Sequence, residues 1–404
     1  MHVDVIPLRL GIDGFRVIAT DERDELVEVV IETVLPAACC PHCGHGTARA
    51  KERKRVIVRD VPLRPGKQTW LVWWKRRFEC LHCKRTFTER HPEIPTRATH
   101  TLRFDHHLAV SATELPYAVV ADQHGVTFYR VDKAARIGAE KFLAARASAP
   151  PTRLCIDEAA HRKGTIFNTI VSDPDMPGVI ELIETRNQAP LQKYLVSLPD
   201  DVKVGIEEVA IDMWGQYRRA VRSGLPDAVI VVDRFHVERI VARALDETRI
   251  AIQRAVRERP LRERKRSPKR KLFYARHKLL RAPERLMQSD VDDLAEIFSL
   301  YPQLETAWAL RWSFRKVYEA PDHIEAERRL HRWYEDVTDS GLADFAAAAA
   351  AIQEWEQELL AYFSSRLTNA FAEGMTNKIK VIKRTGYGFR NFENFRRRVL
   401  MACG

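Results

Sequence analysis

Three short apolar runs in the middle of the chain each end at an aspartate. Leu154-Cys155-Ile156 ends at Asp157, Val209-Ala210-Ile211 ends at Asp212, and Val229–Val232 ends at Asp233. Continuous apolar runs of this length are typical of strands that are buried on both faces of a mostly parallel sheet. Ligands of such sheets bind beyond the carboxyl ends of the strands. The pattern therefore predicts a sheet edge that carries carboxylates, which is a suitable place for a divalent metal ion.

The segments around these runs predict the order of the elements. Strands are expected at residues 152–157, 165–172, 179–185, 204–212 and 228–233, and helices at 190–198 and 216–223. A three-strand meander followed by helix, strand, helix and strand is the topology of a ribonuclease H-like domain. In that fold the first and fourth strands are neighbours, so Asp157 and Asp212 would meet.

The N-terminal part of the chain changes from strand to helix patterns. Residues 15–19, 26–34, 55–58 and 69–78 favour strands, whereas residues 102–138 favour helices with a break at His124-Gly125. Thr127 is a suitable N-cap for the second of two short helices. A helix, a glycine-containing turn and a helix with basic outward positions are typical of a helix-turn-helix, although any helical hairpin has a turn. The predicted DNA-facing residues of that helix are Tyr129, Arg130, Lys133 and Arg136.

From His236 to about residue 360 the pattern is helical, and we interpret this stretch as an α-helical insertion. A last amphipathic helix follows. Its polar face carries Glu373, Asn377, Lys380 and Arg384 at steps of four, three and four, with Met375, Ile379 and Ile382 on the opposite side. A carboxylate followed by amide and basic groups suits a metal beside a phosphate backbone. An ordinary helix with a solvated charged face is the alternative.

Composition adds a polyanion as partner. The 404-residue chain has a net charge of +11, with 45% apolar and 30% charged residues. Residues 254–281 contain 13 lysines and arginines and two acids, so this one segment carries the whole excess. Such a segment suits DNA binding, and a solvated, partly disordered loop is compatible with that role. In this segment the cations expected to contact DNA are Arg264, Lys265, Arg266, Lys269, Arg270 and Lys271. Beside the tryptophans of residues 70–74, Arg76 and Arg77 are expected to do the same.

The cysteines predict a structural zinc ion. Cys40 and Cys43 form one Cys-x-x-Cys knuckle, and Cys80 and Cys83 form a second one. Four thiolates at this spacing close a tetrahedral zinc site, which stabilises a small ribbon in place of a core. Four free thiols are the alternative, and Cys39 is a spare that could replace Cys40. No apolar stretch is long enough to span a bilayer, and the start of the chain predicts a cytosolic protein.

These motifs together resemble the DDE transposases of bacterial insertion sequences, in particular the ISL-three family. The resemblance rests on the Cys-Pro-x-Cys-Gly ribbon, the helix-turn-helix, Ile156-Asp157-Glu158, Asp212-Met213-Trp214 and Asp233-Arg234-Phe235-His236. It extends to Glu373-Gly374-Met375-Thr376-Asn377 and Gly388-Phe389-Arg390-Asn391-Phe392. By resemblance, Asp157, Asp212 and Glu373 are the catalytic carboxylates, Mg²⁺ is the cofactor, and terminal inverted repeats are the substrate.

The expected chemistry is phosphoryl transfer at a DNA phosphodiester with two Mg²⁺ ions. Asp157 is expected to bind both ions, Asp212 one and Glu373 the other, while Lys380 and Arg384 hold flanking phosphates. Asp233 could replace Asp212 as a ligand or position the turn beside it. His236 could support a ligand or simply start a helix.

The predicted fold is multidomain α+β. We expect an N-terminal β unit and zinc ribbon (1–95), a helix-turn-helix domain (96–150), a ribonuclease H-like α/β core (151–237 and 363–404) and the helical insertion with its basic arm (238–362). The expected partners are double-stranded DNA, both inverted repeats and target, and a second copy of the chain in the synaptic complex. A bacterial cytoplasmic location, on the nucleoid when bound, follows from those partners. A DNA-binding regulator and a ribonuclease H-like nuclease without strand transfer are the alternatives.

Overall fold

The computed structural model describes residues 10–47, 49–146, 149–162, 166–258, 269–386, 389 and 391–404. The chain divides into two compact units. The first comprises Met1–Ser148 and Ile382–Ala402, and the second comprises Ala149–Val381 and Cys403–Gly404. Arg264, Lys265 and Arg266 of the predicted basic arm lie outside the described residues.

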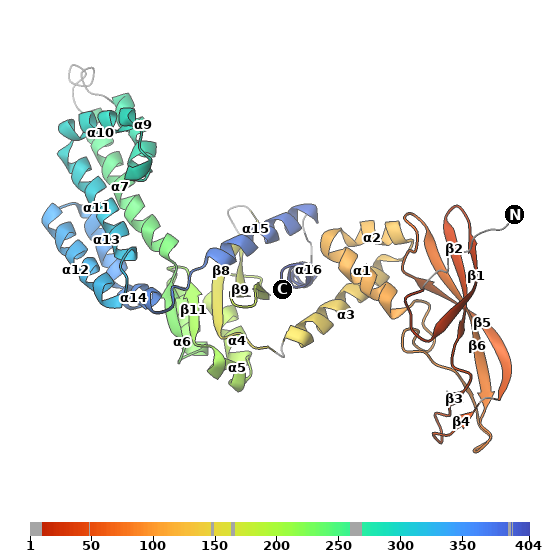
Figure 1. Cartoon of the computed structure of the whole chain (residues 1–404). Coiled ribbons are helices and arrows are strands. Elements are labelled where there is room, and N and C mark those ends of the chain that lie inside the picture. The colour runs from red at the N-terminus through yellow and green to blue at the C-terminus, as the bar shows by residue number, and fades with distance from the viewer. Residues whose placement is uncertain are drawn as a thin grey trace. The chain divides into compact units, whose positions relative to one another are not determined.

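The first unit contains a five-stranded sheet (Figure 1). Its strands are β1 (Phe15–Glu22), β2 (Leu26–Thr33), β5 (Ala50–Asp60), β6 (Gln68–Glu79) and β7 (Thr86–Thr88), and a two-stranded sheet of β3 (Ala38–Cys39) and β4 (Gly46–Thr47) accompanies it. The main order is β1-β2-β6-β5, with β7 on the end of β6. Leu71 and Trp73 of β6 are fully buried, whereas Trp74 is exposed. Leu71 and Trp73 belong to one apolar cluster, so Trp73 packs in the core.

Three helices follow the sheet in the first unit: α1 (Leu102–Glu114), α2 (Tyr117–His124) and α3 (Phe128–Arg146). The break predicted at His124-Gly125 is present, because Gly125 ends α2 with a positive φ of 57° that favours glycine. The hydroxyl of Thr127 accepts a hydrogen bond from the Arg130 backbone N–H at 3.2 Å, as expected of an N-cap.

The C-terminal helix α16 (Phe392–Cys403) differs from the prediction. We expected residues 363–404 to belong with the catalytic core, but almost all of α16 lies in the first unit. The buried Arg398 donates to the Thr113 carbonyl at 2.8 Å, and Arg397 pairs with Asp132 of α3 at 3.1 Å. A periodic apolar pattern shows that a helix buries one face, but it does not show against which neighbour.

The second unit is built on a five-stranded sheet in the order β10-β9-β8-β11-β12. The strands are β8 (Arg153–Arg162), β9 (Ile166–Asp173), β10 (Gly178–Ile183), β11 (Glu208–Ile211) and β12 (Val229–Val232). The first three are antiparallel, and β11 runs parallel to both β8 and β12. The first and fourth strands are therefore neighbours, as predicted. The fourth strand is shorter than expected because a helix, α5 (Asp200–Gly205), occupies its predicted start.

Helices complete the second unit (Figure 1). Leu191 of α4 (Gln188–Ser197) and Val221 of α6 (Gly215–Gly224) share one core with the sheet residues Ile156 and Ile211. The predicted insertion is helical and contains α7 (Arg234–Glu258), α9 (Lys269–Leu280), the 3-10 turn η1 (Pro283–Arg285), α10 (Gln288–Leu300), α11 (Pro302–Tyr318), α12 (His323–Ser340), α13 (Ala343–Gln353) and α14 (Glu356–Ser365). Its apolar residues belong to the same core as the sheet. Among the described helices, none is both long enough and apolar enough to cross a membrane.

Candidate functional site

The pairing of the strands brings the three predicted aspartates to one level of the sheet. Ile211 of β11 pairs with Ile156 of β8 on one side and with Val232 of β12 on the other. Each of these residues directly precedes an aspartate, so Asp157, Asp212 and Asp233 lie next to one another at the sheet edge. The apolar runs bury the strands and leave the carboxylates at the edge, where such sheets bind ligands.

Asn369, which directly precedes helix α15 (Ala370–Thr385), connects that helix to all three strands. Its Nδ2 atom donates to Asp212 Oδ1 at 3.2 Å and to the carbonyl of Ile156 at 3.0 Å. Its backbone N–H donates to Asp233 Oδ1 at 3.2 Å. Asn369 is buried, so these bonds form away from bulk water. They fix the start of α15 at the carboxylate edge.

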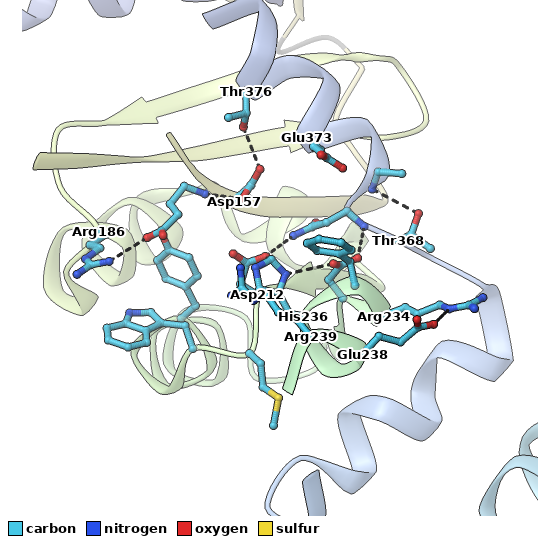
Figure 2. A pocket seen from close by; sticks show the side chains of 18 residues that line it. Asp157, Arg186, Asp212, Arg234, His236, Glu238, Arg239, Thr368, Glu373 and Thr376 are labelled. Atoms are coloured by element: carbon cyan, nitrogen blue, oxygen red, sulfur yellow. Dashed lines mark hydrogen bonds and ion pairs between the residues drawn. The ribbon is translucent and has the colours of Figure 1, made fainter. Parts of the chain in front are cut away.

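A second connection places Glu373 over the site. Thr376, also buried, donates its hydroxyl to Asp157 Oδ2 at 2.9 Å. Glu373 precedes Thr376 by three residues, so both lie on the same face of α15. Figure 2 shows Glu373 on this helix above Asp157 and Asp212. One pocket, with a volume of about 660 Å³, is lined by Asp157, Asp212, Asp233, His236 and Glu373.

Burial makes two carboxylates of this pocket, Asp157 and Asp212, reluctant to ionise. It raises the pKa of Asp212 to about 7, with a further contribution from the neighbouring charge of Asp157. Burial also raises the pKa of Asp157. For His236, burial alone would lower the pKa, but its hydrogen bond to Asp233 and the charge of Asp212 outweigh that effect and raise it. The His236 Nδ1 atom lies 3.2 Å from both Asp212 Oδ1 and Asp233 Oδ2.

The donor atoms of this pocket suit a hard cation. The carboxylates of Asp157, Asp212, Asp233 and Glu373 line it, and the buried Oδ1 of Asn369 accepts no hydrogen bond in the described part of the chain. Outside the ribbon, no three His, Cys, Asp or Glu ligand atoms of the described residues lie within 4.8 Å of one another. The carboxylates therefore share a pocket without closing on one point. This spread is expected when like charges repel.

The four cysteines form a compact cluster in the first unit. Their sulfur atoms all lie within 4.8 Å of one another, with Cys40 and Cys83 at 3.6 Å and Cys43 and Cys80 at 3.5 Å. A tetrahedral ZnS₄ site with bonds of about 2.3 Å requires sulfur–sulfur distances of about 3.8 Å. The cluster fits that requirement closely.

The two knuckles share the same backbone geometry. The N–H groups of Gly44 and Lys84 donate to the carbonyls of Cys40 and Cys80, both at 2.9 Å, and both residues have positive φ. The backbone N–H of Cys83 helps to lower the pKa of Cys80 to about 6, whereas burial and the neighbouring thiols raise the pKa of Cys43. Cys39 is exposed and lies outside the cluster.

Two of the predicted DNA contacts, Arg76 and Arg130, are largely buried in ion pairs. Arg76 is only 14% exposed in its side chain, because Glu89 pairs with it at 2.8 Å. Arg130 is 24% exposed and pairs with Asp105 of α1, so it joins two helices of the first unit. Sequence periodicity gave the direction of each side chain, but it did not reveal these carboxylate partners.

The other predicted cations vary in exposure. Lys133 is half-buried, while Tyr129, Arg136, Lys380 and Arg384 are exposed. Arg77 is exposed and pairs with Glu52 at 2.9 Å. Lys269, Arg270 and Lys271 begin α9, and the description there covers only the backbone.

Comparison with known proteins identifies the family. The family model for the transposases of ISL3 elements matches residues 154–399, a range that contains Asp157, Asp212 and Glu373. A second model, for the zinc finger of the transposases of IS204, IS1001, IS1096 and IS1165, matches residues 36–83 and contains all four clustered cysteines. The chain belongs to the ISL3 family of DDE transposases. The fit of the cysteine cluster and this match both support a structural zinc ion.

Two relatives of this ISL3-family chain are transposases by name. The transposase for insertion sequence element IS1001 of Bordetella parapertussis is 29% identical over 243 residues, which cover 60% of this chain and 58% of that protein. The transposase for insertion sequence element IS1557, from two strains of Mycobacterium tuberculosis, is 26% identical over 314 residues, covering 73% of this chain and 70% of the relative.

Two residues of the pocket escaped the sequence interpretation. Asn369 precedes the helix that carries Glu373, in a position where a helix cap is the ordinary expectation. Thr376 lies one helical turn after Glu373, on the polar face that we described without it. Their spacing from Glu373 puts both residues on the same face of the helix as that glutamate. Their hydrogen-bond partners, however, lie more than 130 residues away in sequence.

Proposed function

We propose that this chain is the transposase of an insertion sequence, which binds the terminal inverted repeats of its element and catalyses Mg²⁺-dependent strand cleavage and strand transfer. The observation that carries the proposal is the pocket of the second unit. Register places Asp157 beside Asp212, and two hydrogen-bonded contacts bring Glu373 to the same place. Family membership supplies the class of reaction.

We assign the fold of this unit as ribonuclease H-like. The strand order β10-β9-β8-β11-β12, with an antiparallel meander followed by two parallel strands, supports the assignment. The helical insertion then separates the strands that carry Asp157 and Asp212 from the helix that carries Glu373. In the first unit we assign α2, the Gly125 turn and α3 as a helix-turn-helix, with the exposed Tyr129 and Arg136 facing DNA.

Asp157, Asp212 and Glu373 would hold the Mg²⁺ ions. When bound, Mg²⁺ lowers the pKa of a coordinated water and balances the charge that develops on the phosphate oxygens. Asp212 is a better ligand than Asp233, because both Asp233 oxygens already accept hydrogen bonds, one from Asn369 and one from His236. No group in the described part of the chain donates to Asp212 Oδ2. Asp233 and His236 act as positioning residues that hold Asp212 and the start of α15.

The surrounding cations would hold the DNA backbone. Arg239 is exposed at the pocket, and the described residues place no carboxylate in an ion pair with it. Lys380 lies two turns after Glu373 on the same exposed face of α15. A cut end held by these groups presents its new 3′-hydroxyl to target DNA for the second step. Pairing of two element ends implies a dimer during the reaction.

One experiment tests the proposal. The protein is incubated with Mg²⁺ and a duplex that carries the ends of the element, together with a target plasmid. We expect cuts at the element ends and covalent joining to the plasmid, both lost in Asp157→Asn. Cutting without joining identifies a nuclease instead. Tight binding of the ends without any cutting identifies a DNA-binding regulator.

A further inference from the structure

Trp214 occupies a position that the local structure does not favour for tryptophan. It is the N-cap residue of α6, where side chains that accept a backbone hydrogen bond are favoured, and its side chain makes no such bond. It is 39% exposed and lines the carboxylate pocket. A residue that breaks a local preference and leaves an apolar ring exposed beside a catalytic centre points to a functional role.

The indole is part of a platform at one side of this pocket, which consists of Trp214, Phe167, Arg186 and Glu158. The Arg186 guanidinium lies over the Trp214 ring at 5.5 Å and over the Phe167 ring at 4.5 Å. Glu158 holds Arg186 from the side at 3.3 Å, and both retain exposed surface. Figure 2 shows Arg186 on the side of the pocket away from Arg234 and Arg239. The platform thus combines an aromatic face with one donor group and one acceptor group.

The chemistry of this platform fits an unpaired nucleobase. A base stacks on an aromatic face whatever its identity, and its edge forms hydrogen bonds with groups such as a guanidinium and a carboxylate. Trp214 follows Asp212 by two residues, a span of at most about 7 Å, which corresponds to about two nucleotides along one strand. A base next to the scissile phosphate is therefore within reach of the platform once it leaves the duplex.

We propose that Trp214 and Arg186 bind one nucleobase of the cleaved DNA, unpaired from its partner, within about two nucleotides of the scissile phosphate. This inference rests on the proposed function, because it places DNA in the pocket. Binding of the base outside the duplex fixes the strand over Asp157 and Asp212. Trp214 is then a positioning residue for the substrate and takes no part in the bond changes.

The test combines Trp214 variants with abasic substrates in single-turnover, Mg²⁺-dependent cleavage of an element-end duplex. We expect Trp214→Ala to cleave the intact duplex about tenfold or more slowly, since one base stack is lost. Trp214→Phe keeps a stacking ring and should stay within a few-fold of the wild-type rate. An abasic nucleotide at one position near the cut should bring Trp214→Ala to the wild-type rate on that same substrate, because no base then has to be unpaired and held.

Two results overturn the inference while the proposed function stands. The first is a Trp214→Ala rate equal to that of the wild type on the intact duplex. The second is a slow Trp214→Ala protein whose defect is the same on every abasic substrate, which would show that the ring only supports Arg186. Should Trp214→Ala fail to fold, Trp214→Leu keeps apolar volume without a ring and takes its place. Absence of cleavage by the wild-type protein refutes the proposed function itself, and this subsite with it.

Discussion

Replacing Asn369 with alanine should uncouple Glu373 from the aspartates while leaving the backbone intact. The side-chain amide makes two hydrogen bonds, one to the Asp212 carboxylate and one to the Ile156 carbonyl. A hydrogen bond to a charged group contributes about 1.5–3 kcal/mol and a neutral one about 0.5–1.5 kcal/mol, so their loss should lower the free energy of unfolding by roughly 2–4 kcal/mol. The backbone N–H bond to Asp233 would remain.

The effect on cleavage should exceed the effect on stability. Asn369 fixes the start of α15, and a displacement of about 1 Å at a reacting centre costs on the order of 100-fold in rate. We therefore expect Asn369→Ala to bind element ends normally but to cleave them about 100 times more slowly. Urea unfolding measures the free energy of unfolding, and single-turnover cleavage at saturating DNA measures the cleavage rate.

Asn187→Ala is the matched control for this prediction. Asn187 also directly precedes a helix, α4, but it is exposed and makes no capping bond through its side chain. Its replacement should change neither the free energy of unfolding nor the cleavage rate. Equal behaviour of the two alanine variants would refute the positioning role of Asn369.

Three further predictions concern Asp212, the zinc ribbon and the basic arm. Asp212→Asn should abolish cleavage yet stabilise the Mg²⁺-free protein by about 1–3 kcal/mol at pH 8. The pKa of Asp212 is raised to about 7 in the fold, so its charge destabilises the folded protein increasingly as pH rises from about 4 through 7. Urea unfolding should therefore show a smaller gain in stability at about pH 5 than at about pH 8. Cys83→Ser should release the zinc ion and unfold the ribbon, as metal analysis and circular dichroism would show, whereas a Cys39→Ser protein that also lost zinc would contradict the ligand assignment. Alanine at Arg264, Lys265 and Arg266 together should reduce the slope of log affinity against log salt by about 2–3 for specific and random DNA alike, and an unchanged slope would remove these cations from the interface.

The core of the site was predictable because it depends on local pattern. An apolar run that ends in an aspartate defines both a buried strand and the place of its carboxylate, so Asp157 and Asp212 could be paired before their strands were seen. Zinc ligands are equally local, since two Cys-x-x-Cys knuckles carry their own geometry. The burial of Ile379 and Ile382 likewise follows from helical periodicity, which puts Glu373 on the opposite face of the helix.

What could not be predicted depends on partners that are distant in sequence. Arg130 has the helical position of a solvent-facing cation, yet Asp105 of another helix binds it. Asn369 resembles an ordinary cap, yet its amide reaches strands that precede it by more than 150 residues. Residues 363–404 were expected to belong to the catalytic core, yet α16 packs in the first unit. In each case the local pattern fixes the element, and a single long-range contact decides the role of the side chain.

Glu373→Gln gives the most direct test of the central claim, that three carboxylates from two strands and a distant helix act at one Mg²⁺ site. Single-turnover cleavage of an element-end duplex is measured for Glu373→Gln, with Glu207→Gln as control, because Glu207 is exposed at the opposite end of β11. The account predicts that Glu373→Gln binds the ends with wild-type affinity and makes no cut, while Glu207→Gln cuts normally. Cleavage by Glu373→Gln at the wild-type rate would contradict it.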